Sequence, residues 1–355
     1  MWQYRRSHRT DCRLAEDKGA SDRAIQKSHH GQRLGRPLKL PIHRIQKRIN
    51  SMANTLTFED RVVVVTGAGN GIGRAYAHEF AKRGAKIVVN DLGGSVAGKG
   101  SDKNCADTVV DEIIANNGHA IANHDSVVDG EKIIDAALGE WGRIDVLLNN
   151  AGIAYPTPFH EMTPELWNRM LSVHVDGSYA CTKAAWSRML EQGFGRLLFT
   201  SSPFGLYAAA NFAHYSAAKA AMLGLSKALA LEGKERNIHA NAIAPFSASR
   251  MTGRTNEEQA KSPFGPRYLA QLAVWLCHES TTETGGVFEV GGGYIHRVRN
   301  ELSNGLHLPG EMHTAENIAE GADTLENFSD ALHPKLGESW TIGKDVFGDD
   351  WSSEF

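Results

Sequence analysis

The sequence contains few cysteines and no long apolar run. Its four cysteines, Cys12, Cys105, Cys181 and Cys277, lie far apart without a C-x-x-C pair, and its histidines do not cluster at ligand spacings. We therefore expect reduced thiols in an intracellular protein and no metal site. No apolar run reaches the roughly 18 residues that a membrane helix needs, so no membrane span is expected.

Negative charge is scarce at the N-terminus. Residues 1–50 contain 13 of the 38 Lys and Arg residues but only 4 of the 41 Asp and Glu residues. Such a start can be an organelle transit peptide or an arm that binds nucleic acid. The stretch lacks a sustained amphipathic period, however, and it ends just before Met52, where MANTLTFEDRVVVVTGAG reads like the start of a domain. We interpret residues 1–51 as a disordered extension or an upstream translation, and we expect no nucleic-acid partner.

From residue 61 onward, short β-branched runs alternate with longer amphipathic stretches. The pattern predicts strands at 61–66, 86–90, 119–123, 144–148, 196–200, 238–243 and 286–290, and helices at 72–83, 102–117, 130–140, 164–191, 210–235 and 266–279. Several strands are apolar throughout, which is typical of a parallel sheet covered on both faces. The predicted fold is α/β: a single Rossmann-type doubly wound domain at 52–300 with a mostly parallel seven-stranded sheet. Residues 301–355 are expected to be a partly helical C-terminal extension, at a partner subunit surface or an edge of the active site.

A glycine-rich segment, TGAGNGIG at 66–73, lies between the first predicted strand and the first helix. Gly67 permits a tight turn, Gly71 lets backbone N–H groups approach a pyrophosphate, and Gly73 lets helix and strand pack closely. The positive end of the helix dipole would face the phosphates. A structural turn can use the same glycines, but the strand-to-helix setting favours a dinucleotide site. We assign Gly67, Asn70, Gly71, Ile72 and Gly73 to it.

Asp91 ends the second predicted strand, where a carboxylate can accept hydrogen bonds from the adenosine ribose and repel a 2′-phosphate. Residues 66–73 contain no Lys or Arg, so NAD is preferred to NADP. Asp91 can equally be a turn residue before Leu92-Gly93-Gly94, and both roles can coexist. Further expected cofactor contacts follow later strands: Asp125 and Ser126, which an Asx turn would also explain, then Asn149, Ala151, Gly152 and Pro245.

Tyr215 and Lys219 stand four residues apart in a strongly helical segment, so their side chains share one face. A phenol has a pKa near 10, and a nearby ammonium stabilises the phenolate. Tyr215 can then take the proton of an alcohol as a hydride leaves for NAD. Ser202, thirteen residues earlier, can hold the substrate oxygen, and spacing alone does not separate it from Ser201.

These motifs, together with Asn241 to Pro245, resemble the short-chain dehydrogenase/reductase family in order and spacing over roughly residues 56–300. The resemblance implies that Lys219 also binds the nicotinamide ribose and that Ser202, Tyr215 and Lys219 act as one unit. The family usually has an asparagine in the long helix after NNAG, where it supports a water relay to the lysine. This chain has His174 at that position.

Further segments, among them NDLGG (90–94), VHVDGS (173–178) and WLCHES (275–280), resemble the (3R)-hydroxyacyl-CoA dehydrogenase domain of peroxisomal multifunctional enzymes of type 2. Histidine also occupies the relay position there. His174 is expected either to relay protons or to be a buried residue satisfied by backbone. The resemblance implies oxidation of (3R)-3-hydroxyacyl-CoA by NAD in fatty acid metabolism. Because the chain ends Ser353-Glu354-Phe355, not a peroxisomal address, and is short for a hydratase domain, we expect a single-function cytoplasmic enzyme.

Two rival functions remain. A related enzyme could act on a steroid, a polyol or a 3-oxoacyl carrier protein, which the lid at 246–266 would decide; its Arg250 and Arg254 can meet CoA phosphates or simply be solvated. An inactive dinucleotide-binding sensor is the other, and the intact Ser202, Tyr215 and Lys219 argue against it. The helices at 164–191 and 210–235 have apolar faces, and in this family such helices pair with a second subunit, so we expect a homodimer or homotetramer.

Overall fold

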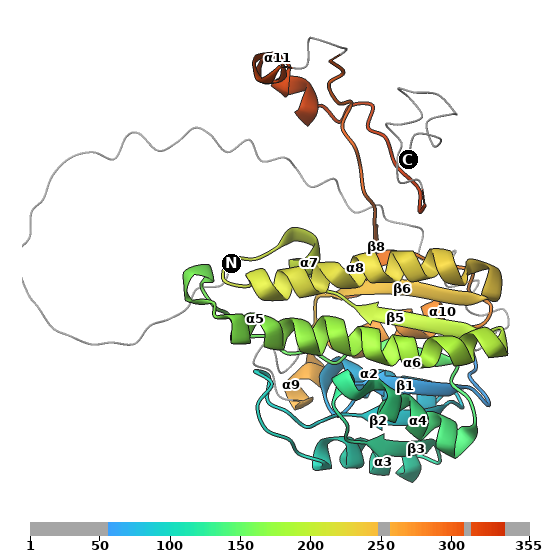
Figure 1. The fold of residues 1–355 in the computed structure, drawn as a ribbon. Coiled ribbons are helices and arrows are strands. Elements are labelled where there is room, and N and C mark those ends of the chain that lie inside the picture. Colours follow the sequence, from blue (N-terminus) through green and yellow to red (C-terminus); the bar gives the residue numbers. More distant parts are fainter. Residues whose placement is uncertain (1–55, 248–255, 309–313, 338–355) are drawn as a thin grey trace, which may run out of the picture. The chain divides into compact units, whose positions relative to one another are not determined.

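Eight strands form one sheet in the computed structural model, which describes residues 56–247, 256–308 and 314–337. The strands are β1 (Val62–Thr66), β2 (Lys86–Asn90), β3 (His119–Asn123), β4 (Val146–Asn149), β5 (Gly195–Thr200), β6 (Ile238–Pro245), β7 (Val287–Gly291) and β8 (Tyr294–Val298). Their order is β3-β2-β1-β4-β5-β6-β7-β8 (Figure 1). The first seven are parallel, and the order reverses beside β1. The predicted doubly wound Rossmann fold is confirmed.

The eighth strand adds to the seven that the sequence predicts. β8 runs antiparallel to β7, and the two glycines between them, Gly292 and Gly293, have φ angles of +58° and +82°. Positive φ at both central residues is what a two-residue type I′ turn requires, and glycine adopts it at little steric cost. Most of the side chains of β8 are exposed, so this strand lacks the apolar signal of the other seven.

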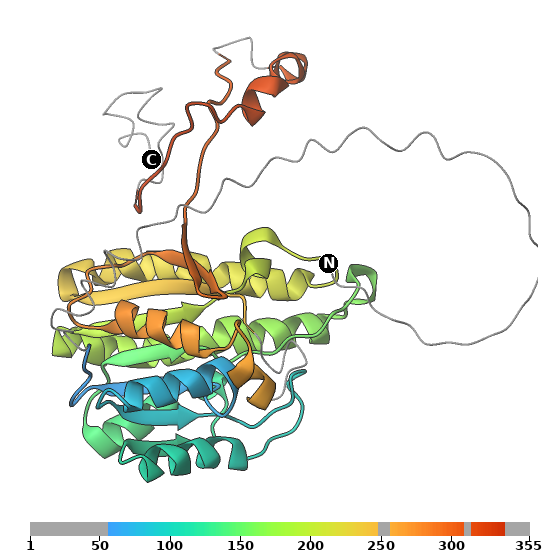
Figure 2. The same ribbon diagram turned by 180° about the vertical axis from the view of Figure 1, so that it is seen from behind.

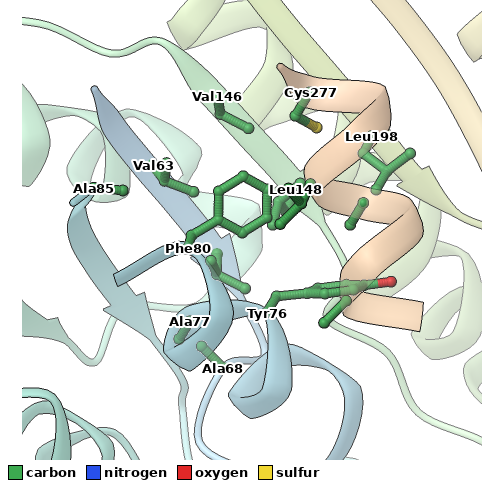
Figure 3. Packing of buried hydrophobic residues seen from close by; sticks show 14 of the residues in the cluster. Val63, Ala68, Tyr76, Ala77, Phe80, Ala85, Val146, Leu148, Leu198 and Cys277 are labelled. Atoms are coloured by element: carbon green, nitrogen blue, oxygen red, sulfur yellow. The ribbon is translucent and has the colours of Figure 1, made fainter. Parts of the chain in front are cut away.

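Helices cover both faces of the sheet. The helices α2 (Gly71–Ala81), α3 (Asn104–Ala115) and α10 (Arg267–Cys277) lie on one face, and α4 (Gly130–Trp141), α6 (Gly177–Gln192) and α8 (Ala213–Gly233) lie on the other (Figures 1 and 2). On the first face Val63 packs with Phe80 and Cys277 (Figure 3). Val64 points the opposite way and packs in the second cluster with Met189. Because successive side chains of a strand alternate between faces, a run of valines is what a doubly covered strand needs.

Several helices differ from the prediction. The segment 164–191 is not one uniform helix, because a π-helical turn at Ser172–Asp176 separates α5 (Pro164–Leu171) from α6. A short helix, α7 (Pro203–Tyr207), precedes α8. Another, α9 (Asn256–Lys261), lies before α10. In the C-terminal part, α11 (Ala315–Glu320) and a 3₁₀ turn (Ala322–Glu326) are the helical elements among the described residues.

Two predicted features lie outside the described residues: the extension at 1–51 and the lid arginines Arg250 and Arg254. In the part of the chain that the structure describes, no helix combines the length and the apolar character needed to cross a bilayer. The parallel strands bring Thr66, Asn149, Thr200 and Pro245 to one edge of the sheet. Ligands of open α/β sheets bind outside this carboxyl edge, where the strand order reverses.

Candidate active site

The passage from β1 into α2 accepts only glycine at two positions, one in the loop and one in the first turn of the helix. A Cβ on Gly73 would lie 2.2 Å from the carbonyl oxygen of Gly67, and one on Gly67, whose φ is +65°, would lie 2.8 Å from Cα of Ala151. Helix α2 begins at Gly71; the Asn70 side chain makes no capping hydrogen bond, and the first turn carries no acid. Its first N–H groups and its dipole therefore suit a negatively charged ligand such as a pyrophosphate.

Asn150 fastens this loop to the end of β4. Its Nδ2 donates to the carbonyl oxygens of Thr66 (2.9 Å) and Gly67 (3.2 Å). The Thr66 hydroxyl accepts from the backbone N–H groups of Asn150 (3.0 Å) and Ala151 (3.1 Å). Asn150 is not among the residues predicted from the sequence, although both of its neighbours are. Two adjacent asparagines at the end of a strand give no sign of which one faces the loop.

Asn149 turns away from the groove. It is 4% exposed, and its Nδ2 donates to the hydroxyl of Thr182 in α6 at 2.9 Å. Its amide therefore joins β4 to α6, and the structure does not bring this side chain together with the glycine loop. Pro245 lies at the end of β6, paired with Val290 of β7 at the carboxyl edge of the sheet.

Both carboxylate oxygens of Asp91 already accept backbone hydrogen bonds. Oδ2 accepts from Gly69 at 2.8 Å and Oδ1 accepts from Gly93 at 2.7 Å. Asp91 is thus the expected turn residue and also holds the glycine loop in place. A carboxylate has about four acceptor lone pairs, so two remain for the hydroxyls of a ribose. The two backbone hydrogen bonds therefore do not exhaust the acceptors of Asp91.

Asp125 and Ser126 follow β3 in a hydrogen-bonded polar turn. The backbone N–H of Asp125 donates to Asn123 Oδ1 at 3.1 Å, and Asn123 Nδ2 donates to Asp125 Oδ2 at 2.8 Å. Asn90 donates to the carbonyl oxygen of Asp125 at 2.9 Å. Ser126 precedes a 3₁₀ turn without a side-chain cap. The Asx-type turn exists, and it places both residues next to β2, which ends at Asn90, one residue before Asp91.

Lys219 is buried beneath Tyr215 on α8. Its Nζ donates to the carbonyl oxygen of Thr200 at 2.7 Å and lies 5.7 Å from the centroid of the Tyr215 ring. Burial lowers the pKa of Lys219 to about 7. An ammonium has three donors, so two remain beside the tyrosine. A lysine with this pKa can both accept and release a proton near neutrality.

Burial also raises the pKa of Tyr215, and a hydrogen bond with the Ser202 hydroxyl lowers it in part. The expected lowering of the tyrosine pKa by the lysine charge does not prevail in this structure. Burial of the phenol is the largest cause, and Lys219, with a pKa of about 7, has already lost its charge at the higher pH where a phenol ionises.

The structure separates the two adjacent serines. Ser202 caps α7, where its Oγ accepts from the backbone N–H of Phe204 at 3.1 Å, and its hydroxyl is close enough to Tyr215 to lower the pKa of the phenol. Ser201 is 1% exposed, and its Oγ donates to the carbonyl oxygen of Lys219 at 2.7 Å. Ser202 therefore belongs to the tyrosine site, whereas Ser201 braces the backbone of α8.

His174 lies in the π-helical turn, 1% exposed, against the loop after β4. Its Nε2 is 2.8 Å from the carbonyl oxygen of Ile153, whereas Nδ1 has no partner among the described residues. Burial, then the neighbouring Lys219, hold the pKa of His174 well below its usual range. The imidazole is therefore neutral at pH 7. The backbone N of Ile153 lies 3.1 Å from the same Nε2, which can donate to the carbonyl oxygen or accept from this N–H; in the tautomer with its proton on Nε2, Nδ1 is left as an acceptor.

Gly152 makes room for this histidine. A Cβ on Gly152 would lie 2.4 Å from Cε1 of His174 and 3.1 Å from its Nδ1. Gly152 is predicted to lie in the cofactor groove, and in the structure it also lies directly against the histidine ring. Its neighbour Ile153 supplies the carbonyl that holds Nε2.

Most of this chain is similar in sequence to known proteins. The sequence profile of the family described as short chain dehydrogenase matches residues 61–260. Peroxisomal multifunctional enzyme A of Dictyostelium discoideum is 48% identical over 279 residues, which are 79% of this chain and 63% of that protein. Peroxisomal multifunctional enzyme type 2 of Mus musculus is 46% identical over 294 residues, 82% of this chain and 40% of that protein. The chain thus spans less than two thirds of either relative.

A solved structure carries a nicotinamide cofactor on the same fold. It is a 7α-hydroxysteroid dehydrogenase complexed with NADH and 7-oxo glycochenodeoxycholic acid, with a TM-score of 0.60 and 28% identity, over 68% of this chain and 98% of that one. The names of the relatives also correct one expectation. A cytoplasmic enzyme was expected from the last three residues, but the relatives are named as peroxisomal, and the cytoplasmic assignment is wrong.

Proposed function

The chain belongs to the short-chain dehydrogenase family, and on this premise we propose that it oxidises (3R)-3-hydroxyacyl-CoA to 3-oxoacyl-CoA with NAD. Membership itself makes the chain an oxidoreductase that binds a nicotinamide dinucleotide and a small-molecule substrate. The observation that carries the proposal is the convergence of Ser202, Tyr215 and Lys219 at the ends of β5 and α8. The resemblance to multifunctional enzymes supports the substrate class.

The choice of NAD rests on the glycine loop and on Asp91. The open N-terminus of α2 suits the pyrophosphate, and the carboxylate of Asp91 retains lone pairs for the ribose hydroxyls. A 2′-phosphate at the same place would meet this negative charge. Gly67, Asn70, Gly71, Ile72, Gly73, Asp125, Ser126, Ala151, Gly152 and Pro245 remain proposed cofactor contacts.

The reaction divides among three side chains. When bound, oxidised NAD accepts a hydride and adds positive charge to the site. The Ser202 hydroxyl donates to the substrate oxygen, since its own Oγ already accepts from the backbone of α7. Tyr215 takes the proton of the alcohol as its own phenolic proton leaves toward Lys219. Lys219, with a pKa of about 7, accepts that proton in its neutral form and releases it again at neutral pH.

His174 is proposed as the next proton carrier. Its ring lies beside Tyr215, and Lys219 is close enough to lower its pKa. With Nε2 held by the Ile153 backbone, a neutral imidazole with a free Nδ1 can accept a proton there and release it again from the same nitrogen. The backbone contact at Nε2 satisfies one nitrogen only, which leaves Nδ1 for this task.

A homodimer or homotetramer is proposed from the helices of one face. Tyr179 of α6 and Leu231 of α8 are 58% and 46% exposed, although both helices pack firmly on the sheet. Exposed apolar side chains on adjacent helices are typical of subunit contacts. Light scattering of the purified chain should give a mass of two or four subunits, and a monomer mass would contradict the assignment.

Substrate identity is tested by NADH formation with (3R)-hydroxybutyryl-CoA and longer (3R)-hydroxyacyl-CoA esters. The (3S) isomers serve as stereochemical controls, and a bile-acid steroid and a polyol represent the rival reactions; the steroid is included because of the similar 7α-hydroxysteroid dehydrogenase structure. A higher kcat/KM for the steroid or the polyol would refute the acyl-CoA proposal. Equal kcat/KM values for NAD and NADP would remove the role given to Asp91. Near-normal turnover by Tyr215→Phe would overturn the catalytic assignment.

A further inference from the structure

Two phenylalanines lie beside Tyr215 without a part in the chemistry described so far. Phe204 belongs to α7, and Phe212 is the N-cap of α8. The centroids of the two phenylalanine rings are 5.2 Å apart, and each lies 6.1 Å from the centroid of the Tyr215 ring. We name Phe204 and Phe212 the aromatic wall.

The aromatic wall is fixed to the groups that would hold the substrate oxygen. The backbone N–H of Phe204 donates to Ser202 Oγ at 3.1 Å, so the phenylalanine and the serine move as one turn. Gly205, the next residue, is pressed against α8: a Cβ there would lie 2.7 Å from the backbone carbon of Lys219. The wall is therefore held at a fixed position relative to Tyr215 and Lys219.

The wall also presents apolar surface at the site. Phe204 is 36% exposed, whereas Tyr215 beside it is 9% exposed. Phe204 and Phe212 pack against each other and against the tyrosine, which leaves an uncovered aromatic edge next to Ser202. Apolar surface beside a few convergent polar groups is the usual composition of a site that binds an apolar ligand.

We propose that the aromatic wall receives the alkyl chain of the substrate and sets a preference for long chains. The inference rests on the proposed function. A carbinol carbon held at Ser202 and Tyr215 carries two arms: an alkyl chain and an arm leading to the thioester and its polar amides. Aromatic rings bind the first better than the second, because only the alkyl arm loses no hydrogen bonds to water on burial.

The test is the dependence of kcat/KM on chain length. With hydroxybutyryl-, hydroxyoctanoyl- and hydroxydodecanoyl-CoA, the wild-type value should rise roughly three- to fourfold for each methylene that reaches the wall. In Phe204→Ser and Phe212→Ser, kcat/KM should rise less steeply with chain length, mainly because KM for the long substrates increases. The long substrates should therefore show the largest loss of kcat/KM. Phe204→Leu, which keeps an apolar side chain, should retain much of the rise. Phe159→Ser, at a residue 74% exposed in a separate 3₁₀ turn, is the matched control and should keep the wild-type slope.

A second substrate series separates this inference from the proposed function. Secondary alkan-2-ols of increasing length carry the alkyl arm without CoA. Suppose that wild type turns over no acyl-CoA but its kcat/KM rises with chain length on these alcohols, and that Phe204→Ser and Phe212→Ser lose this rise. The aromatic wall is then confirmed as the alkyl site, and the acyl-CoA assignment is wrong. If folded Phe204→Ser and Phe212→Ser, checked by thermal unfolding, keep the wild-type slope in whichever series is turned over, the wall is not the chain site. The absence of any slope in wild type would overturn it equally.

Discussion

The ring of His174 meets the ring of Tyr215 edge-on, with centroids 5.5 Å apart and an interplanar angle of 87°. The π-helical turn at Ser172–Asp176 creates this contact, since its wider winding interrupts the regular helix at the histidine. Single π turns inside helices occur frequently at functional sites. Here the turn places the one unsatisfied nitrogen of His174 in the neighbourhood of the lysine and tyrosine.

Replacement of His174 tests whether the ring moves protons. His174→Leu should lower kcat about tenfold or more, because general acid–base steps contribute at least that much. His174→Asn, which restores the amide usual in the family, should keep kcat within about threefold. The measurements are pH profiles of kcat and solvent deuterium isotope effects for both variants. A purely structural histidine would change stability alone, so an unaltered profile and isotope effect in folded His174→Leu would exclude the relay.

Gly152→Ala tests the fit between the NNAG turn and the histidine. The new Cβ would collide with His174 Cε1 at 2.4 Å, so a loss of about 1 to 3 kcal/mol in the free energy of unfolding is expected. The loss should shrink when His174→Asn is also present, because the shorter side chain frees the space. A double-mutant cycle by chemical denaturation measures this coupling.

Gly139→Ala is the matched control for that cycle. A Cβ on Gly139, in α4, would meet no atom within 4 Å, and alanine favours a helix. It should leave stability unchanged or raise it by up to about 1 kcal/mol. Additive effects of Gly152→Ala and His174→Asn would show that the predicted collision does not determine the cost.

The fold could be predicted because its signals are local. The four valines of β1 and the glycines of residues 66–73 reveal a buried strand and the start of a helix without knowledge of distant contacts. Strand β8 was not predicted, because its side chains are mostly exposed and its main sequence signal is the pair Gly292-Gly293. The π turn could not be predicted because the helical period of 164–191 continues through it, and the contact of His174 with Ile153 is a tertiary contact that no local pattern reveals.

The site was predictable in its residue types more than in its electrostatics. Spacing located Tyr215 and Lys219, but the pKa of each depends on burial by distant segments, and burial reversed the expected effect on the tyrosine. Spacing likewise could not separate Ser201 from Ser202, because the two are distinguished only by the helix that each hydroxyl faces.

Alanine substitutions of the two serines should differ in their effect on kcat but not in their effect on the free energy of unfolding. Ser201→Ala removes a buried hydrogen bond to α8, and Ser202→Ala removes the cap of α7, so each should lower the free energy of unfolding by about 1 kcal/mol. Only Ser202→Ala should lower kcat, by about a hundredfold, as expected on loss of a donor to the substrate oxygen. Each variant is the control for the other in parallel assays of Tm and kcat. A larger kcat loss in Ser201→Ala would reverse the assignment.

Lys219→Met should stabilise the cofactor-free protein near neutral pH. Burial holds the pKa of Lys219 at about 7 in the folded chain, against an ordinary 10.5. Between these values the unfolded chain binds the proton that the folded chain has released, so the stability of wild type rises with pH. The methionine variant lacks this proton. At about pH 7 the free energy of unfolding of the variant should exceed that of wild type by up to about 5 kcal/mol. This is the difference of about 3.5 between the two pKa values, at about 1.4 kcal/mol per pKa unit. The loss of the hydrogen bond to Thr200 reduces this gain.

The pH dependence of that gap is the decisive measurement. Chemical denaturation between about pH 7 and pH 9.5 should show the gap closing by up to about 1.4 kcal/mol per pH unit. The lower limit avoids protonation of His174, whose pKa is lowered, and the upper limit avoids ionisation of Tyr215, whose pKa is raised. Lys183→Met, at an exposed position on α6, is the control, and its free energy of unfolding should change with pH as that of wild type does. A gap for Lys219→Met that stays constant over this range would mean that the buried lysine keeps its proton, and the proton-releasing role proposed for it would fail.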